Sequence, residues 1–583
     1  MLKVLKKLSK QDIFCILIAV IFIAAQVWLD LRMPDYMTEI TQLVQTEGSE
    51  MSAVLSAGGK MLLCALGSLV SAVVVSILAA RIATDFGADL RGLLFDKVQS
   101  FSMAEVGQFS TASLITRTTN DVMQVQMLII MGLQALIKAP LMAGWAIIKI
   151  ADKSTEWTLT TAAAVAVLLI IVVIAIAVVL PKFRKLQQLT DDMNRVTREN
   201  LTGIRVVRAY NAEDYQETKF TEANNNLTDT HLFTGRAMAF MMPSIQLVMN
   251  GLSLAIYLIG AMLIENAAIP DKLVLFSDMI VFTQYAMQVV MAFMLLVMLF
   301  ILYPRAAVSA KRIAEVLDMP LSIKDGTVSG SKMAHSGEIE FRNVGFRYPG
   351  AEENMLQNIS FTAKKGETVA IIGATGSGKS TLVNLIPRFY DVSEGEVLVD
   401  GINVKEYSQY VLRDKIGYVS QKATLFSGTV RDNIAFGDSS KNLDHNYVEA
   451  AYTAQAAEFI DNMSDGYGSH IAQGGGNLSG GQKQRLSIAR AICRKPEILI
   501  FDDSFSALDY KTDRTLRRQL DEDCTGTTKI IVAQRIGTIR DADRILVLDD
   551  GRMVGSGTHS ELMRDCEVYR QIAYSQLSEE ELA

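Results

Sequence analysis

Residues 367–381 read Glu-Thr-Val-Ala-Ile-Ile-Gly-Ala-Thr-Gly-Ser-Gly-Lys-Ser-Thr, and this stretch decides the fold of the second half of the chain. The part up to Ile372 is an apolar run typical of a buried strand, and Leu382 to Phe389 has the pattern of a helix. The pattern G-x-x-x-x-G-K-S lies between them, where glycines let backbone N–H groups converge on phosphate oxygens. The sequence therefore predicts a strand, a phosphate-binding loop and a helix.

The residues of this loop have separate predicted roles. We expect Lys379 to reach the β- and γ-phosphates of a nucleotide triphosphate and Ser380 to ligate Mg²⁺. A second apolar run begins at Ile498 and ends in Asp502, which we expect to support the same Mg²⁺. ATP and Mg²⁺ are thus the predicted ligands. The other loop positions predicted to bind the nucleotide are Gly373, Thr375, Gly376, Ser377, Gly378 and Thr381.

The first half of the chain contains six apolar stretches that suit membrane helices. A helix needs about 20 residues to cross a ~30 Å hydrocarbon core. The first stretch lacks the small-residue cleavage site of a signal peptide, so we interpret it as a span. The predicted spans are Ile13 to Leu29, Met61 to Ala80, Met127 to Ile148, Trp157 to Leu180, Ala237 to Ile264 and Met279 to Tyr303.

The charges between the spans predict the topology. Most of the Lys and Arg residues precede the first span or lie in the segments after the second and fourth spans, which favours cytoplasmic N- and C-termini. The three tryptophans, Trp28, Trp145 and Trp157, then fall near the outer ends of helices, where an aromatic belt would place them. We therefore predict a multi-pass protein of a bacterial-type plasma membrane.

Composition supports this division and excludes some functions. The 583 residues are 50% hydrophobic and carry a net charge of −7, so the chain lacks the basic field of a nucleic-acid binder. The five cysteines are scattered without metal-binding spacing and are typical of a reduced, cytosol-facing protein. We predict an all-α six-helix transmembrane domain in residues 1–304, a linker in 305–336 and an α/β P-loop NTPase domain in 337–583.

A third motif reveals a family resemblance. Asn477-Leu-Ser-Gly-Gly-Gln-Lys-Gln-Arg485 lies between the two phosphate motifs. With six helices ahead of one nucleotide-binding domain, the chain resembles the exporters among ATP-binding cassette (ABC) transporters along essentially its whole length. The resemblance implies that Tyr348 stacks on adenine, that Gln421 senses Mg²⁺ and faces the membrane domain, and that Asp509 belongs to the D-loop. It also implies coupling helices around Met103 to Ser110 and around Asn211 to Tyr215.

The signature segment predicts a dimer. Ser479, Gly480 and Gly481 lie at a predicted helix N-terminus, followed by Gln482, and form a second phosphate cradle. One ATP cannot easily contact two distant cradles of one domain, whereas two chains arranged head to tail would sandwich ATP between them. Each site would then combine the Lys379 region of one chain with the Ser479 region of the other.

Two departures from the family pattern concern hydrolysis. The resemblance implies a Glu after Asp502 and a His after the strand Lys529 to Ala533, but this chain has Asp503 and Gln534. A carboxylate shortened by one methylene is misplaced by more than an ångström, which can cost ~10²-fold in rate, and Gln cannot shuttle a proton. The pattern resembles the degenerate-site half of a heterodimeric exporter, whose partner keeps the catalytic Glu and His.

Several alternatives remain open at this stage. The two changes are compatible with harmless drift, with a homodimeric lipid or drug exporter that has two slow sites, or with an ATP-gated channel or sensor that does not pump. The predicted cargo is a hydrophobic drug-like compound or a lipid. Lys138 is predicted either to contact substrate, to form an ion pair or to snorkel. The methionine stripe of the last span is compatible with cargo binding or simple packing and consists of Met287, Met291, Met294 and Met298.

Overall fold

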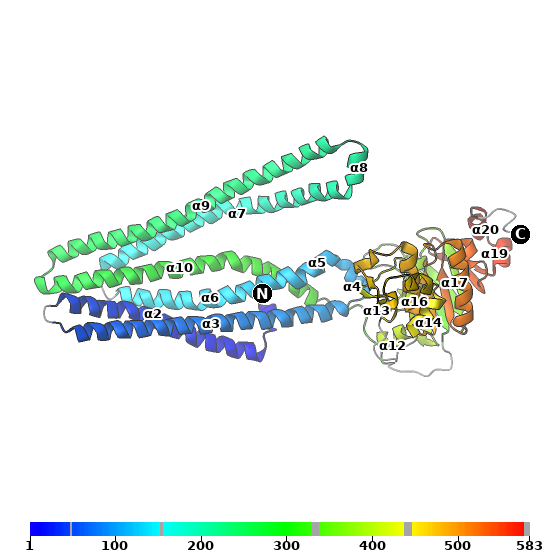
Figure 1. The fold of residues 1–583 in the computed structure, drawn as a ribbon, viewed down its shortest axis with the longest axis horizontal. Coiled ribbons are helices and arrows are strands. Elements are labelled where there is room, and N and C mark those ends of the chain that lie inside the picture. The colour runs from blue at the N-terminus through cyan, green and yellow to red at the C-terminus, as the bar shows by residue number, and fades with distance from the viewer. Residues whose placement is uncertain (47–48, 152–154, 329–336, 437–445, 577–583) are drawn as a thin grey trace. The chain divides into compact units, whose positions relative to one another are not determined.

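The chain folds into two compact units. The computed structural model describes residues 1–46, 49–151, 155–328, 337–436 and 446–576 (Figure 1). The membrane unit comprises Met1–Val98 and Ala112–Asp318, and the nucleotide unit comprises Gln99–Thr111 and Met319–Ala583. The short segment around residue 105 thus belongs with the nucleotide unit, although it lies between two helices of the membrane unit in the sequence.

Long helices build the membrane unit. Six of them are long and apolar enough to cross a membrane, which confirms the predicted six-helix domain. The helices also continue well beyond the apolar stretches, and α9 has 54 residues. The helices are α1 (Leu2–Leu5), α2 (Lys10–Gln45), α3 (Met51–Gln99), α5 (Thr111–Thr116), a π-helix (Arg117–Asp121), α6 (Val122–Ala151), α7 (Thr155–Thr202), α8 (Ile204–Ala209), α9 (Glu213–Asn266) and α10 (Ile269–Leu317).

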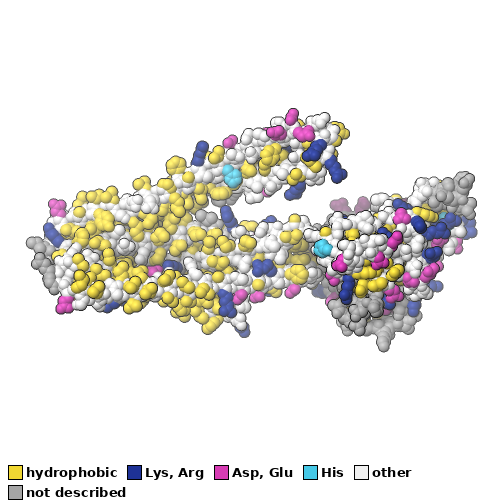
Figure 2. Space-filling view, viewed as in Figure 1, with side chains coloured by type: hydrophobic (Ala, Val, Ile, Leu, Met, Phe, Trp, Pro, Cys, Tyr) yellow, Lys and Arg dark blue, Asp and Glu magenta, His cyan; other side chains and the backbone are white. Residues whose placement is uncertain are grey.

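The membrane helices pack in pairs. α6 runs along α10, and α7 runs along α9, with the short α8 joining the far ends of that second pair (Figure 1). Trp157 is fully buried, and its ring centroid lies 5.2 Å from that of Phe282. Figure 2 shows hydrophobic side chains spread over the outer faces of these helices. Such an exposed apolar surface is what a helix bundle presents to lipid.

Polar groups inside the membrane unit pair with one another. Lys138 Nζ on α6 lies 3.5 Å from Asp30 Oδ2 on α2, and the other oxygen of Asp30 accepts a hydrogen bond from Ser68. The Lys138 and Asp30 side chains are only 20% and 18% exposed. Of the three predicted roles of Lys138, the structure favours the ion pair, since an unpaired charge would be costly in this position.

A second polar cluster joins α2, α6 and α10. The buried Tyr285 donates its hydroxyl to Asp35 Oδ1 at 2.6 Å, and Lys149 Nζ lies 2.9 Å from Asp35 Oδ2. Tyr285 also reaches the carbonyl of Leu31 at 3.1 Å. Its hydroxyl is thus used within the helix bundle, which ties α10 to α2.

We predict that Lys138→Met destabilises the protein by about 1–3 kcal/mol, because the half-buried Asp30 carboxylate loses its cation. Thermal unfolding in detergent measures the effect. Asp30→Asn combined with Lys138→Met should cost less than the sum of the two single changes, since the double variant strands no charge. Strictly additive losses would contradict the ion pair.

Strands dominate the core of the nucleotide unit. Its main sheet has six strands in the order β12-β11-β3-β10-β9-β6, beside a four-stranded sheet ordered β2-β1-β4-β5 and a two-stranded one. This arrangement confirms the predicted α/β domain. The strands are β1 (Ile339–Phe346), β2 (Leu356–Ala363), β3 (Thr368–Gly373), β4 (Glu394–Val399), β5 (Ile402–Asn403), β6 (Ile416–Val419), β7 (Gly428–Thr429), β8 (His470–Ile471), β9 (Ile498–Asp502), β10 (Thr528–Val532), β11 (Arg544–Asp549) and β12 (Arg552–Gly557).

The register of the parallel strands positions the site. β10 pairs in parallel with β3 on one side and with β9 on the other, and β6 continues the sheet beyond β9. All five residues of β9 and of β10 are buried, as expected of strands covered on both faces by helices. The carboxyl ends of these four strands therefore share one edge of the sheet, where ligands of open α/β sheets bind.

Helices cover both faces of the main sheet. Two apolar clusters flank it, one of which includes Phe501 and Leu486, and the other Ile500 and Leu382. The helices of this unit are α4 (Met103–Gln108), α11 (Lys379–Leu385), α12 (Gln409–Asp414), α13 (Val430–Ile434), α14 (Asn446–Thr453), α15 (Ala457–Asp461), α16 (Gly480–Cys493), α17 (Tyr510–Asp523), α18 (Ile536–Ile539), α19 (His559–Asp565) and α20 (Glu567–Tyr574).

Three segments can be compared in detail with the sequence expectations. α4 coincides with the predicted short helix at 103–110, whereas the second short helix, α8, ends at Ala209, just before the predicted break at Asn211 to Tyr215. α10 continues past Pro304 to Leu317, so the first residues of the expected 305–336 linker are helical. The part of that linker at 329–336 lies outside the described residues.

Candidate functional site

The phosphate-binding loop follows β3 in a conformation that requires glycine. Gly376 and Gly378 have φ values of 88° and 95°, in the left-handed region that glycine adopts readily. A Cβ at Gly373 would lie 2.1 Å from the carbonyl oxygen of Leu548. Gly378 caps α11, whose first residues are Lys379, Ser380 and Thr381. The predicted phosphate cradle is thus present in the chain, with Thr375 and Ser377 between its glycines.

Lys379 lies at the centre of the loop. Its Nζ donates to the carbonyl oxygens of Gly373 and Ala374 at 2.9 and 2.7 Å. Burial lowers the pKa of Lys379, and the charges of Asp503 and Asp502 counteract part of this effect. The loop therefore holds a cation close to two acids at the edge of the sheet.

Ser380 and Asp502 meet as the sequence predicts. The hydroxyl of Ser380 donates to Asp502 Oδ1 at 2.7 Å. Burial raises the pKa of Asp502 and the charge of Asp503 adds to this, while hydrogen bonds from Ser380 and Tyr418 oppose it. A hydroxyl and a carboxylate side by side are hard oxygen donors of the kind that Mg²⁺ prefers.

The next residue, Asp503, is held by two glutamines. Gln534 Nε2 and Gln421 Nε2 both donate to Asp503 Oδ2, at 2.8 and 3.1 Å. Asp503 is only 8% exposed and has a φ of 48°, a left-handed conformation that aspartate tolerates better than most residues. Gln421 follows β6 and Gln534 follows β10, so the parallel register brings all three side chains together.

Two tyrosines complete this part of the site. The hydroxyl of Tyr348, predicted to stack on adenine, lies 2.9 Å from Thr381 Oγ1, beside the phosphate-binding loop. Tyr418 donates to Asn384 Oδ1 at 3.0 Å and to Asp502 Oδ2 at 3.3 Å. The sequence prediction assigned no role to Tyr418. Its position three residues before Gln421, at the end of a strand, is the sequence feature that could have indicated a role in the site.

The signature segment forms a separate part of the nucleotide unit. Ser479 caps α16 and forms a reciprocal capping box with Gln482: Ser479 N donates to Gln482 Oε1 at 2.9 Å, and Gln482 N donates to Ser479 Oγ at 3.3 Å. Ser479 and Gly480 are exposed, and Gly481 and Gln482 are half-buried. The segment is therefore accessible to a ligand or a second chain.

Asp509 has a comparable local role at the start of α17. Its two oxygens accept from Thr512 N at 2.9 Å and from Thr512 Oγ1 at 2.7 Å, and these bonds hold the pKa of Asp509 below its usual value. The structure thus brings together Lys379, Ser380, Asp502, Asp503, Gln421 and Gln534, while the signature and Asp509 bond within their own segments.

Comparison with known proteins identifies both units. Residues 16–315 match the family described as ABC transporter transmembrane region, and residues 356–506 match the family described as ABC transporter. The chain belongs to the ABC transporter family. An uncharacterized ABC transporter ATP-binding protein of Mycobacterium tuberculosis is 40% identical over 530 residues, which cover 90% of this chain and 88% of that protein.

Two further relatives refine the comparison. The ATP-dependent lipid A-core flippase of Pseudomonas aeruginosa is 33% identical over 484 residues, covering 83% of this ABC transporter and 79% of the flippase. A bacterial Atm1-family ABC exporter with ATP bound has the same fold, with a TM-score of 0.80 at 23% identity, over 98% of this chain and 99% of that one. This chain is therefore a multi-pass ABC transporter with a fused ATP-binding domain, and it shares the fold of that exporter.

We predict that Lys379→Ala weakens ATP binding at this chain's own site, because the β- and γ-phosphates lose their cation. Photolabelling of the nucleotide unit by an azido analogue of ATP should fall at least about tenfold at a fixed analogue concentration. Lys364→Ala, at an exposed lysine in the same unit, serves as the control. Unchanged labelling of the Lys379→Ala protein would contradict the assignment of the phosphate-binding loop.

Proposed function

We propose that this chain is one half of a heterodimeric exporter and that its own ATP site turns over slowly. It holds ATP and Mg²⁺ in that site and lends its signature segment to the hydrolysing site of a different partner chain, which keeps the catalytic Glu and His. The observation that carries the proposal is the double amide contact on Asp503: Gln421 and Gln534 donate to the same carboxylate oxygen.

This contact disfavours Asp503 as a general base. A catalytic base must reach the proton of the attacking water, and Asp503 is one methylene shorter than the Glu of the family pattern. Its Oδ2 already accepts two hydrogen bonds, so the lone pairs of that oxygen are directed at the two amides and not at a water. Gln534 donates to Asp503 but carries no proton that it can release, unlike a histidine. The local chemistry therefore favours retention of ATP over hydrolysis.

The binding functions of the site are intact under this proposal. Ser380 and Asp502 provide the hydroxyl and carboxylate oxygens for Mg²⁺, and the side-chain oxygen of Gln421 is a further candidate ligand. Bound Mg²⁺ supplies charge neutralisation at the β- and γ-phosphates. Lys379 and the backbone N–H groups of the loop orient the phosphates, and Tyr348, next to Thr381, is positioned to contact the adenine.

The proposed cargo is a hydrophobic drug-like compound or a lipid, moved across a bacterial plasma membrane by a protein with both termini in the cytoplasm. The relative named as a lipid A-core flippase moves an amphiphile, which supports this class. On α10, Met291 and Met298 are 51% and 43% exposed, while Met287 and Met294 are half-buried. Flexible, polarisable methionines suit contacts with varied apolar molecules.

We predict that Asp503→Glu with Gln534→His raises ATP hydrolysis at this site about tenfold, below the ~10²-fold that repositioning a base can supply. Each single change should raise hydrolysis by less than half of the double variant's gain in activation free energy, because both residues act on one transition state. The measurement requires the heterodimer with the partner's catalytic Glu replaced by Gln, so that only this site hydrolyses ATP.

The parent protein is the control in that experiment, and ATP binding is measured alongside hydrolysis. A double variant that binds ATP but is no faster than its parent would contradict the assigned roles of Asp503 and Gln534. A parent that hydrolyses ATP at the rate of an ordinary transporter would reject the slow site altogether. Affinity purification from the native host also tests whether there is a different partner chain. Recovery of a dimer that contains this chain alone would contradict the heterodimer and indicate a homodimer.

We also predict that Ser479→Arg abolishes most steady-state ATP hydrolysis of the heterodimer, although Ser479 belongs to the slow chain. Its segment would cap the γ-phosphate in the partner's site, where a bulky cation blocks closure. Ser556→Arg, at an exposed position of β12 in this unit, is the matched control and should retain activity. Near-normal hydrolysis by the Ser479→Arg heterodimer would contradict the head-to-tail arrangement.

A further inference from the structure

α4 buries a carboxylate and exposes its apolar side chains. Within Met103–Gln108, Glu105 is 2% exposed, whereas Met103 and Val106 are 45% and 36% exposed. A six-residue helix is too short to be stable by itself, so contacts outside it must hold it in place. The contact that holds α4 to the nucleotide unit is therefore polar and centres on Glu105.

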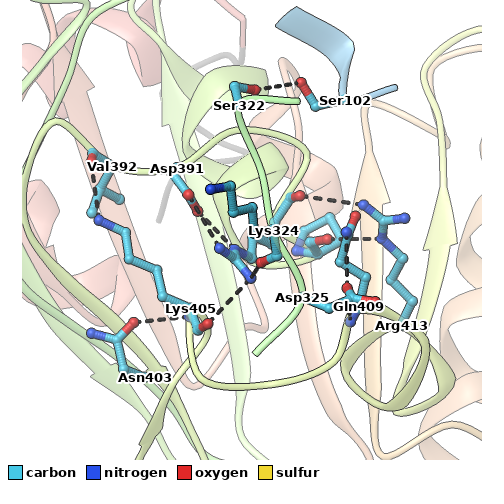
Figure 3. Close-up of polar contacts among 12 residues, drawn as sticks. Ser102, Ser322, Lys324, Asp325, Asp391, Val392, Asn403, Lys405, Gln409 and Arg413 are labelled. Carbon is cyan, nitrogen blue, oxygen red and sulfur yellow. Dashed lines mark hydrogen bonds and ion pairs between the residues drawn. The ribbon is translucent and has the colours of Figure 1, made fainter. Parts of the chain in front are cut away.

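The two oxygens of Glu105 bond to different segments, one to the N-cap of α4 itself and the other to a residue 217 positions away. Oε2 accepts from Ser102 N at 2.7 Å and closes the capping box of α4, and Oε1 accepts from Ser322 N at 3.0 Å. The hydroxyls of Ser102 and Ser322 lie 3.0 Å apart, which adds a third link (Figure 3). Burial opposes the charge of Glu105, but the bonds from Ser322 and Ser102 outweigh it and hold its pKa below the usual value.

The segment that contains Ser322 is itself fixed to the nucleotide unit. Asp325 Oδ1 accepts from the backbone N–H and the side chain of Gln409 at 3.1 and 3.0 Å. Gly326 N donates to Tyr407 O and Val328 N donates to Glu406 O, at 3.0 and 2.9 Å. Figure 3 shows this segment passing between the side chains around Lys405 and Arg413. Residues 322–328 are thus bonded to the nucleotide unit like an added strand.

Arg388 links the same segment to the nucleotide site. This arginine is 4% exposed and lies just after α11, the helix that begins with Lys379. Its guanidinium bonds both oxygens of Asp391 at 2.7 and 3.2 Å and donates to the carbonyls of Lys324 and Lys405 at 3.0 and 3.3 Å. A buried, bidentate arginine holds its partners in a fixed geometry.

We propose that Glu105 is a positioning residue that couples the ATP cycle to the membrane helices. The path runs from α11 through Arg388 to Lys324, along the segment to Ser322, and through Glu105 into α4. α4 lies in the sequence between α3 and α5, so a displacement of α4 acts on both helices through the chain. The inference rests on the ATP-driven cycle of an exporter and is independent of the cargo and of the partner's identity.

The two-oxygen contact is what makes Glu105 suited to this role. One oxygen bonds within α4 and the other bonds to Ser322 N, so a single side chain joins the helix to the segment by directed hydrogen bonds. The segment cannot slide past α4 without leaving a buried charge unpaired, which is costly. The link therefore stays closed while the nucleotide unit moves.

Glu105→Gln tests the proposal, since the amide keeps the size of the side chain but can accept at one oxygen only. The chain's three tryptophans, Trp28, Trp145 and Trp157, all lie in the membrane unit, so quenching of their fluorescence by acrylamide follows that unit. We expect the purified Glu105→Gln dimer to hydrolyse ATP at a rate within about twofold of the parent's. The change in quenching caused by ATP and vanadate should be at least about threefold smaller than in the parent. Glu353→Gln, at an exposed glutamate, is the control.

A disulfide provides the rescue. The adjacent hydroxyls of Ser102 and Ser322 allow Ser102→Cys and Ser322→Cys to form a cross-link that replaces the lost contact. In the Glu105→Gln background, oxidation should restore the quenching change and reduction should remove it again. Glu105→Gln without the added cysteines controls for the five native ones, which are free. Ser322→Ala, which removes one hydroxyl, gives a smaller loss if Glu105→Gln prevents folding.

Three results would overturn the proposal. One is a quenching change in Glu105→Gln equal to that of the parent. Another is a cross-link that forms without restoring the change. The third is a parent protein without any ATP-dependent change, which would also count against the exporter cycle itself, whereas the first two results would leave that cycle intact.

Discussion

The parallel register of β3, β10, β9 and β6 is the constraint on which the nucleotide site depends. Val532 lies opposite Ile371 on one side and Asp502 on the other, and Val419 lies opposite Phe501. Because strands in this register end at one edge, the residues that follow them must meet there. Gln421 and Asp503, 82 residues apart, are hydrogen-bonded for this reason. The same constraint places Gln534 beside Asp503, so two amides donate to this acid.

The membrane unit must satisfy its polar groups internally, since lipid offers them no hydrogen-bond partner. Its solution is to pair those groups between helices: Lys138 with Asp30, and Tyr285 and Lys149 with Asp35. These pairs join α2 to α6 and α10, and Gln288 on α10 adds a hydrogen bond to the carbonyl of Asp30 on α2. Dispersion forces alone would permit many relative rotations of such helices, whereas a few directed bonds select one arrangement.

The sequence predicted what local pattern and composition determine. The six spans, the phosphate-binding loop and the strand ending in Asp502 each follow from a continuous stretch, and all are present. The contacts between distant stretches could not be predicted from the sequence. Spacing indicates no partner for Lys138, and the Asp503–Gln534 contact requires the strand order, which one sequence does not contain. Glu105 and Ser322 are 217 residues apart and match no motif. The position of α8 shows the same limit, because the helix begins directly after its N-cap Gly203, upstream of the more polar stretch that the sequence indicated.

The proposed slow site and the proposed link through Glu105 are compatible because they use different parts of the nucleotide unit. Hydrolysis depends on Asp503 and Gln534 at the ends of β9 and β10, whereas the link begins at Arg388, beyond the end of α11. α11 carries Lys379 and Ser380, which belong to the proposed phosphate-binding part of the site and not to the proposed hydrolytic pair. A change at Asp503 can therefore slow hydrolysis while the response of α11 to ATP still reaches α4. Binding energy alone can shift a conformational equilibrium when a ligand prefers one state, so in the proposed heterodimer this chain would contribute by binding ATP while its partner sets the rate of the cycle.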